Sequence, residues 1–195
     1  MDLGLSGKKA VITGATRGIG RAIANLLADE GVSLAICSRD QDSVTQAVKE
    51  LSAKGVKVTG AAIDVADKES YQAWIASAGK ELGGIDIFVP NVSAGGGSVD
   101  EAGWTKNFNV DLLGTTRGIE AAMPFLEKSD AASIVVIGSV AAVEEFMMPQ
   151  TYNAIKAAVI VHAQQLALAL GGKGIRVNCV SPGPVYIEGG DWDYI

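Results

Sequence analysis

Short apolar runs alternate along this chain with longer stretches in which apolar residues recur every three to four positions. The short runs indicate buried β-strands, and the longer period indicates helices that pack through one face. Strands are predicted at residues 8–13, 32–38, 57–64, 86–89, 133–137 and 175–180. Helices are predicted at residues 21–30, 41–54, 67–82, 104–126 and 152–170. Because strand and helix alternate throughout, we predict a single α/β domain over residues 1–195, with a doubly wound parallel sheet in three layers.

Several residues predict where the helices begin and end. Gly31, Gly55 and Gly171 each follow a helical stretch, and glycine commonly ends a helix. Asp67 is predicted to cap the third helix through its carboxylate. Pro124 predicts a kink, or the last turn, of the long helix at residues 104–126.

The composition excludes some classes of function. Hydrophobic residues make up 48% of the 195 residues and charged residues 19%, which is typical of a well-buried α/β core. A net charge of −6 argues against a nucleic acid or an anionic membrane as partner. We find no run of ~18 uninterrupted apolar residues and no apolar signal-peptide core, so a cytoplasmic location is the expectation. Cys37 and Cys179 lack metal-ligand spacing, and we expect two reduced core thiols and no metal site.

A glycine-rich turn, residues 14–20, joins the first predicted strand to the first predicted helix. Glycines allow the backbone to approach a pyrophosphate closely, and the N-terminus of the helix offers free N–H groups and a positive dipole end. The pattern here is Thr-Gly-x-x-x-Gly-x-Gly. The turn therefore predicts a dinucleotide site in a Rossmann-like fold, with a turn that binds no ligand as the alternative.

Tyr152 and Lys156 stand four residues apart in the fifth predicted helix, on the same helical face. A free phenol has a pKa of about 10. An ammonium group one turn away favours the phenolate and lowers that pKa. The pair therefore indicates a general acid/base, and the alternative is a half-buried tyrosine beside a surface lysine.

Further motifs fall where ligands bind in such a sheet, at the carboxyl ends of the strands. In chain order the motifs are the Thr13–Gly20 turn, Asp64-Val65, Asn91, Ser139, Tyr152-x-x-x-Lys156 and Pro182-Gly183. With these motifs the chain resembles the short-chain dehydrogenase/reductase family over essentially its whole length. Ser139 precedes Tyr152 by thirteen residues, as in the bacterial ketoacyl-carrier-protein reductases of that family.

The resemblance implies an oxidoreductase that transfers hydride between a nicotinamide cofactor and a carbonyl or secondary alcohol. It implies that Tyr152 is the general acid/base, that Ser139 orients the substrate oxygen, and that Lys156 binds the ribose and lowers the pKa of Tyr152. The cofactor-binding residues that it implies are Gly14, Thr16, Arg17, Gly18, Ile19, Gly20, Ser38, Arg39, Asp64, Val65, Asn91, Tyr152, Lys156, Pro182, Gly183 and Val185. Ser139 could instead only cap a turn, and Asn91 could be an ordinary turn residue.

The chain departs from the family pattern at two places. Pro90-Asn91-Val92-Ser93 replaces the frequent Asn-Asn-Ala-Gly, and Asp111 stands where the resemblance places a fourth catalytic residue, an Asn. An ionised Asp only accepts hydrogen bonds, whereas an Asn also donates them. Asp111 could order a proton-relay water beside Lys156, or it could draw Lys156 away. Asp111 therefore favours the alternative function, a catalytically impaired nucleotide-binding or sensor protein of the same fold.

The end of the second strand predicts which dinucleotide binds. An NAD-selective site needs an acid there, but Ser38 occupies the place and Arg39 follows. Two guanidinium groups, those of Arg17 and Arg39, can hold a 2′-phosphate. Asp40 is interpreted as the start of the next helix. The sequence therefore predicts NADP (NADPH), with NAD as the alternative.

The helices at residues 104–126 and 152–170 are apolar around most of their circumference. Ile119, Ala122, Leu166 and Leu170 are the candidates for an outward face. Family members commonly pair these helices, so the resemblance implies a homodimer or homotetramer. His162, the one histidine, is expected to serve packing or a subunit contact.

The last residues also depart from the resemblance. Family members usually continue with a substrate-covering segment and a seventh strand beside the sixth, which is predicted here as an open edge. Ile187 replaces the family's Thr, and Gly189-Gly190 with Trp192 and Tyr194 resembles the entry to a lid. We therefore expect the natural protein to be longer. Met147-Met148 could line a substrate pocket or simply pack.

Overall fold

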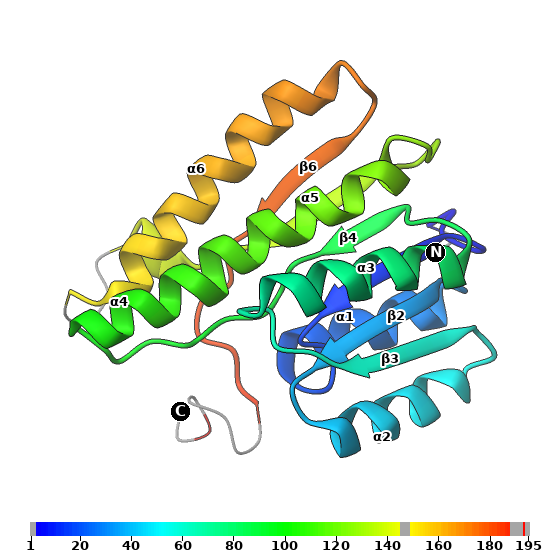
Figure 1. The fold of residues 1–195 in the computed structure, drawn as a ribbon, viewed down its shortest axis with the longest axis horizontal. Coiled ribbons are helices and arrows are strands. Elements are labelled where there is room, and N and C mark those ends of the chain that lie inside the picture. The colour runs from blue at the N-terminus through cyan, green and yellow to red at the C-terminus, as the bar shows by residue number, and fades with distance from the viewer. Residues whose placement is uncertain (1–2, 145–148, 188–192, 194–195) are drawn as a thin grey trace.

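Six parallel strands form the sheet of the computed structural model, which describes residues 3–144, 149–187 and 193. The sheet has the order β3-β2-β1-β4-β5-β6 (Figure 1). Its strands are β1 Lys9–Thr13, β2 Ser33–Ser38, β3 Val58–Ala62, β4 Ile87–Val89, β5 Ser133–Ile137 and β6 Arg176–Val180. The chain runs outward from β1 to β3, returns to β4 beside β1, and then runs outward to β6. The predicted doubly wound parallel sheet is confirmed, and β6 forms one edge of it in the described part of the chain.

Helices cover both faces of the sheet. They are α1 Gly18–Asp29, α2 Gln41–Ser52, α3 Lys68–Leu82, α4 Glu101–Asn107, α5 Gly114–Leu126 and α6 Thr151–Gly171, with a π-helix η1 at Phe108–Leu113 and a 3₁₀-helix η2 at Val140–Ala142. Successive residues of β1 face opposite ways: Val11 belongs to a core cluster that includes residues of α3, α5 and α6, whereas Ile12 belongs to one that includes residues of α1 and α2. The three predicted layers are confirmed.

The helix starts follow local chemistry, with one correction. The carboxylates of Asp40 and Asp67 cap α2 and α3 by accepting hydrogen bonds from Ser43 N at 2.8 Å and Ser70 N at 3.4 Å. The cap at Asp67 was predicted, whereas Asp40 was interpreted only as the start of the helix. Helix α1, expected from residue 21, begins at Gly18. The last residues of the glycine turn therefore form the first turn of α1. The sequence did not predict this, because glycine has no side chain to contribute to an apolar helical period.

The long helix expected at residues 104–126 is three joined segments. Helix α4 begins at Glu101 behind an Asp100 cap, η1 follows as a π-helix, and Pro124 lies in the last turn of α5, which ends at Leu126. A π-helix carries more residues per turn and occurs mostly as single turns at functional sites. Within it, the Asp111 carbonyl accepts a hydrogen bond from the Thr115 hydroxyl at 2.7 Å. Side-chain periodicity does not predict this change of pitch.

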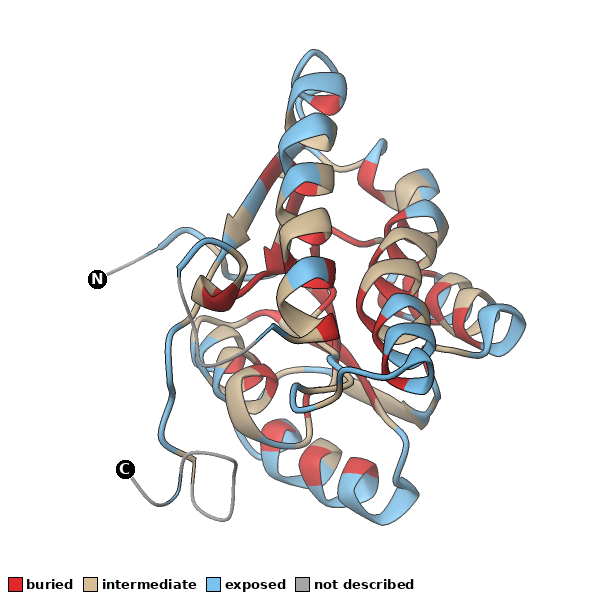
Figure 2. Cartoon of the chain, turned by 90° about the vertical axis from the view of Figure 1, so that its left-hand side faces the viewer, coloured by how far each residue is buried: buried red, intermediate tan, exposed pale blue. Residues whose placement is uncertain are grey.

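The residues proposed for the outward face of α5 and α6 are wrong. Ile119, Ala122 and Leu170 are buried, and Leu166 packs partly buried against the same core, because α3 covers α5 and the inner side of α6 faces the sheet. Figure 2 shows the buried residues on the inward faces of the helices. The outward apolar residues of this region are instead Val161 and Leu168 on α6, which are 54% and 80% exposed, together with Trp104 on α4 and Phe108 on η1.

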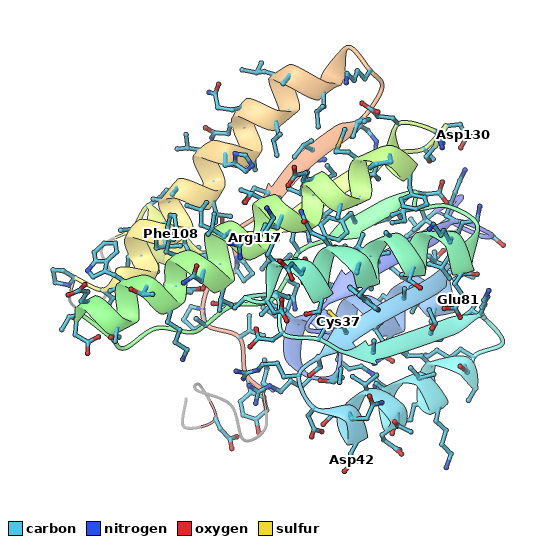
Figure 3. The ribbon with its side chains drawn as sticks, in the orientation of Figure 1. Cys37, Asp42, Glu81, Phe108, Arg117 and Asp130 are labelled. Carbon is cyan, nitrogen blue, oxygen red and sulfur yellow. The ribbon has the colours of Figure 1, made fainter. Side chains whose placement is uncertain are left out.

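Helix α6 and the cysteines bear on two further expectations. Among the described residues, α6 alone is long and apolar enough to cross a membrane by length and composition, with a mean hydropathy of 1.4. One such helix is weak evidence, because core helices of soluble proteins pass the same test, and Lys156 and His162 interrupt its apolar run. Cys37 lies buried near the carboxyl end of β2 (Figure 3), and burial raises the pKa of its thiol to about 12. Cys37 and Cys179 are both free, as expected.

The predictions for Met147-Met148, Gly189-Gly190, Trp192 and Tyr194 lie outside the described residues.

Candidate active site at the carboxyl ends of the strands

The glycine turn after β1 has a backbone that only glycine adopts easily. Gly14 and Gly18 have φ of +66° and +58°, in the left-handed region. A Cβ at Gly20 would overlap the carbonyl oxygen of Gly14 and lie 2.5 Å from Asn91 Nδ2. Gly14 and Gly18 are therefore required by their positive φ, and Gly20 by the lack of space for a side chain. Thr16 and Ile19 lie half-buried between them.

Asn91, at the end of β4, ties that strand to the glycine turn. Its Nδ2 donates hydrogen bonds to the carbonyl oxygens of Thr13 and Gly14 at 3.0 and 3.2 Å. The Thr13 hydroxyl accepts in return from the backbone N–H of Asn91 at 2.9 Å. Asn91 is therefore more than an ordinary turn residue. Thr13 was recognised only as the first residue of the motif, and its hydroxyl proves to be part of the site.

The N-terminus of α1 suits an anion. Asp40, Asp67 and Asp100 cap α2, α3 and α4, whereas α1 has no side-chain cap, and its first turn carries no acid. Its N-cap residue, Arg17, is extended and exposed. Free N–H groups, a positive dipole end and a glycine turn that leaves no room for side chains together fit the pyrophosphate of a dinucleotide.

The carboxyl ends of β2 and β3 lie side by side, on the same side of the sheet as the glycine turn. Ile63 N donates to the Ser38 carbonyl oxygen at 2.8 Å, which joins the two strand ends, and Arg39 next to it is exposed. Asp64 is exposed and accepts a hydrogen bond from Ala66 N at 2.9 Å. Val65 is buried, so its side chain is part of the core.

The segment after β6 returns toward the glycine turn. The Pro182 carbonyl oxygen accepts a hydrogen bond from Val140 N at 3.1 Å, which fixes it beside η2, and Gly183 and Val185 are exposed. The side chain of Ile187 lies against Gly18, 3.0 Å from where a Cβ would stand. The structure therefore places Pro182-Gly183 beside the segment that follows β5, which contains Ser139, and it places Ile187 beside the glycine turn.

Ser139, Tyr152 and Lys156 converge after β5 and on the first turns of α6. The Ser139 hydroxyl hydrogen-bonds the phenol and also accepts from Ala141 N at 3.2 Å, so it acts both as a cap of η2 and as a partner of Tyr152. Lys156 Nζ lies 5.7 Å from the centre of the Tyr152 ring. It donates to the Ile137 carbonyl oxygen at 2.9 Å. The predicted trio is thus held together in space.

Asp111 on η1 also reaches this group. Its Oδ1 lies 3.3 Å from Lys156 Nζ, and both side chains are almost fully buried. Its Oδ2 accepts hydrogen bonds from Ala94 N at 3.0 Å and Asn107 Nδ2 at 3.2 Å. Asp111 therefore connects Lys156 with the loop that follows β4.

The expected lowering of the Tyr152 pKa is corrected by the structure. Burial raises the pKa of Tyr152 above its ordinary value, the hydrogen bond from Ser139 lowers it, and the negative charge of Asp111 raises it. The net direction is upward. The main reason is burial of the phenol, to which the negative charge of Asp111 adds. Lys156 is itself paired with Asp111 and hydrogen-bonded to β5.

Sequence reasoning missed two buried polar residues, Asn107 and Thr151. The Thr151 hydroxyl donates to Asn107 Oδ1 at 2.6 Å, and Asn107 Nδ2 also donates to the Gly95 carbonyl oxygen at 3.0 Å. Nearby, Gln150 Oε1 accepts from Gly97 N at 2.7 Å. No sequence signal could have paired residues 107 and 151, which lie 44 positions apart.

Metal chemistry has no counterpart in the described ranges: residues 3–144, 149–187 and 193 contain no group of three or more His, Cys, Asp or Glu side chains that could hold an ion. A cavity of about 300 Å³ lies at the opposite, amino ends of the strands, where Lys9, Gly84 and Asp86 contribute to its lining. Cavity size therefore does not locate the site, whereas the converging polar groups do.

Comparison with known proteins finds a family whose model matches most of the chain. The family model for short chain dehydrogenases matches residues 8–189. Isoepoxydon dehydrogenase patN of Penicillium expansum is 37% identical over 199 residues, covering 99% of this chain and 76% of the relative. L-sorbose reductase of Gluconobacter frateurii, solved with NADPH and L-sorbose, has a TM-score of 0.91 at 31% identity, covering 99% of this chain and 80% of that one. Carveol dehydrogenase of Mycobacterium avium, solved with NAD, has a TM-score of 0.84 at 27% identity, covering 91% and 70%.

Proposed function

Since the chain belongs to the short-chain dehydrogenase/reductase family, an oxidoreductase family, we propose that its single domain transfers hydride between NADPH and a carbonyl or secondary alcohol, with Tyr152 as general acid/base. The observation that carries the proposal is the convergence of Ser139, Tyr152 and Lys156 at the carboxyl ends of the strands. The nicotinamide would supply or accept the hydride when bound. The residues of the chain handle the proton and the orientation of the substrate.

In the direction of reduction, the Tyr152 hydroxyl gives its proton to the substrate oxygen as that oxygen gains negative charge. The Ser139 hydroxyl donates a hydrogen bond to the same oxygen and holds it in line with the phenol. Lys156, on the face of the Tyr152 ring, contributes hydrogen-bond donors for the ribose. In the direction of oxidation each step runs in reverse, and Tyr152 must begin as the phenolate.

The preference for NADP over NAD rests on the end of β2. Asp40 is engaged as the cap of α2, so its carboxylate serves the helix, and Ser38 takes the place of an acid. Arg39 and Arg17 are exposed and free to approach a 2′-phosphate. The solved relatives include one with NADPH and one with NAD, so the preference is argued from these residues and not from likeness.

Arg39→Ala should weaken NADPH binding at least ~10-fold and leave NADH binding unchanged, because one charge-assisted hydrogen bond contributes roughly 1.5–3 kcal/mol. The dissociation constants of both cofactors can be measured by the fluorescence of the reduced nicotinamide. Arg176→Ala, which removes an exposed arginine from the edge strand β6, is the matched control and should change neither. An unchanged ratio of the two constants in Arg39→Ala would contradict the assignment.

The alternative function, a dinucleotide-binding protein without turnover, is distinguished from an enzyme by measuring cofactor binding and turnover together. Asp111 favours a protein that binds the dinucleotide without turnover, because its carboxylate occupies Lys156. Tight NADPH binding together with no oxidation or reduction across a panel of small ketones and alcohols would support that second function. Turnover of any of them would support the enzyme.

We extend the proposal to assembly and location. The outward face of α6 presents Val161 and Leu168, and Trp104 is exposed on the neighbouring α4 and Phe108, labelled in Figure 3, on η1. Exposed large apolar residues are typical of subunit interfaces, and we propose a homodimer or homotetramer through these residues. The two free thiols and the net charge of −6 support a reducing, cytoplasmic location without nucleic-acid partners.

Light scattering at micromolar concentration should give a mass of at least twice that of the chain. The double variant Val161→Glu, Leu168→Glu should give the monomer mass, because two charges on the apolar face would be buried without partners. A control pair on the surface away from this face, Gln46→Glu and Lys49→Glu on α2, should leave the mass unchanged. A monomer mass for the unaltered chain would contradict the proposal.

A further inference from the structure

The strongest unexplained feature is a negative charge buried beside the general acid. Asp111 is 1% exposed and Lys156 is 3% exposed, and 3.3 Å separates Asp111 Oδ1 from Lys156 Nζ. A buried carboxylate is tolerated only when it is paired and hydrogen-bonded. Here both conditions are met, since Oδ2 accepts from Ala94 N and from Asn107 Nδ2.

The surroundings of position 111 offer only donors. The Gly95 carbonyl oxygen accepts from Asn107 Nδ2, and the Thr151 hydroxyl donates to Asn107 Oδ1. These two contacts fix the orientation of the Asn107 amide, so that it presents an N–H group to Asp111. Ala94 N is the second hydrogen-bond donor to Oδ2, and Lys156 Nζ forms an ion pair with Oδ1, which accepts no hydrogen bond from the described residues. An ionised carboxylate has no N–H group and is compatible with all three groups. An amide at position 111 would instead place its own NH₂ group against one of them, where neither group could accept a hydrogen bond.

The ion pair changes what Lys156 can do to Tyr152. Lys156 Nζ is 5.7 Å from the centre of the phenol ring, but its charge is opposed by Asp111 at 3.3 Å. Ser139 faces the phenol from the end of β5, Lys156 from α6 itself and Asp111 from η1, while the neutral Asn107 and Thr151 lie behind Asp111. An ammonium group whose charge is balanced favours a phenolate much less than a free one.

We propose that Asp111 is a positioning residue that balances the charge of Lys156 and keeps the Tyr152 hydroxyl protonated at neutral pH, so that the site favours giving a proton to a carbonyl over taking one from an alcohol. This inference rests on the proposed function of Tyr152 as the general acid/base.

The pKa of Tyr152 is raised, which agrees with a hydroxyl that stays protonated. Burial raises it first, the Ser139 hydrogen bond lowers it, and the charge of Asp111 raises it again. Reduction needs the protonated phenol and is lost as pH rises through this pKa. Oxidation needs the phenolate and is gained over the same interval. A higher pKa therefore widens the pH range of reduction and moves oxidation to more alkaline pH.

The direct test titrates Tyr152 in the full chain, without substrate. Tyrosine labelled with ¹³C at Cζ reports phenol ionisation by NMR, and Tyr152→Phe identifies the resonance. In the unaltered chain, Tyr152 should titrate above the free value of about 10. In Asp111→Asn the titration should move down by roughly one pH unit, the effect of removing a nearby charge. Asn107→Ala, which loosens the same network but keeps the charge, should cause no downward shift.

The pH profiles of kcat/KM provide the second readout. In Asp111→Asn, reduction of a ketone should decline at a lower pH than in the unaltered chain, and oxidation of the alcohol should rise at a lower pH. A purely structural role would reduce both profiles without moving them. Asp111→Ala is the second charge-removing variant if Asp111→Asn does not fold.

Two results would overturn the inference. One is a Tyr152 titration below pH 10 in the unaltered chain, which needs no variant to fold. The other is an unmoved or raised titration in a folded Asp111 variant. Failure of the proposed function looks different: the titrations would behave as expected while no carbonyl or alcohol is turned over.

Discussion

Tyr152→Phe should lower turnover at least ~10²-fold while cofactor binding persists, which is the loss expected when a general acid is removed. The substitution takes away the proton and the hydroxyl oxygen but almost no volume, so the packing of α6 should remain. Lys156 stays in place through its contacts with Ile137 and Asp111, so the ribose donors stay available. Turnover is followed by absorbance of the reduced nicotinamide, and binding by its fluorescence.

Tyr186→Phe is the control for this experiment. Tyr186 is 66% exposed and follows β6, so the loss of its hydroxyl should change neither turnover nor binding. Turnover retained within a few fold in Tyr152→Phe would remove Tyr152 from the mechanism. Loss of binding and turnover together would instead point to damage to the fold.

Gly20→Ala should abolish tight cofactor binding and lower stability. The new Cβ would overlap the backbone carbonyl of Gly14 and lie 2.5 Å from Asn91 Nδ2, so the turn and its tie to β4 must shift. Overpacking of this kind costs roughly 1–3 kcal/mol, which corresponds to a fall in Tm of about 2–12 °C for a domain of this size. We expect NADPH affinity to fall at least ~10-fold, because misplaced N–H groups lose the pyrophosphate.

Gly171→Ala is the matched control. A Cβ at Gly171 would meet nothing within 4 Å, and the residue ends α6 in a helical conformation. Alanine favours a helix over glycine by roughly 0.5–1 kcal/mol, so this variant should be equal or slightly raised in Tm, with unchanged binding. Calorimetry and cofactor fluorescence measure both. An equal response of the two variants would show that the geometry of the turn does not control the site.

Local chemistry determined much of this protein. The alternation of apolar runs with helical periods was sufficient for the parallel sheet and its layers, because side-chain period reports directly which face is buried. The cap at Asp67 was predictable for the same reason, since a capping carboxylate acts on an N–H group three residues away. Tyr152 and Lys156 were recognised as one unit because one helical turn joins them.

Apolar character alone did not predict orientation. Ile119, Ala122 and Leu170 were expected to face outward, yet all three are buried, while Leu168 in the same helix as Leu170 is 80% exposed. A helix that is apolar all round has no polar face to mark the solvent side. Its orientation is decided by what packs against it, here α3 on α5 and the sheet beneath α6.

The sequence by itself therefore determined the sheet, the glycine turn and the pairing of Tyr152 with Lys156, because each depends on residues that are near one another in the chain. Only the tertiary structure decided the charges around Tyr152. The π-helix η1 brings Asp111 to Lys156, and the end of α4 brings Asn107 to Thr151 across 44 positions. No local sequence pattern predicts either contact. The pKa of Tyr152 is raised and not lowered, first because the phenol is buried and then because Asp111 lies near it, and sequence spacing determines neither burial nor distance in space.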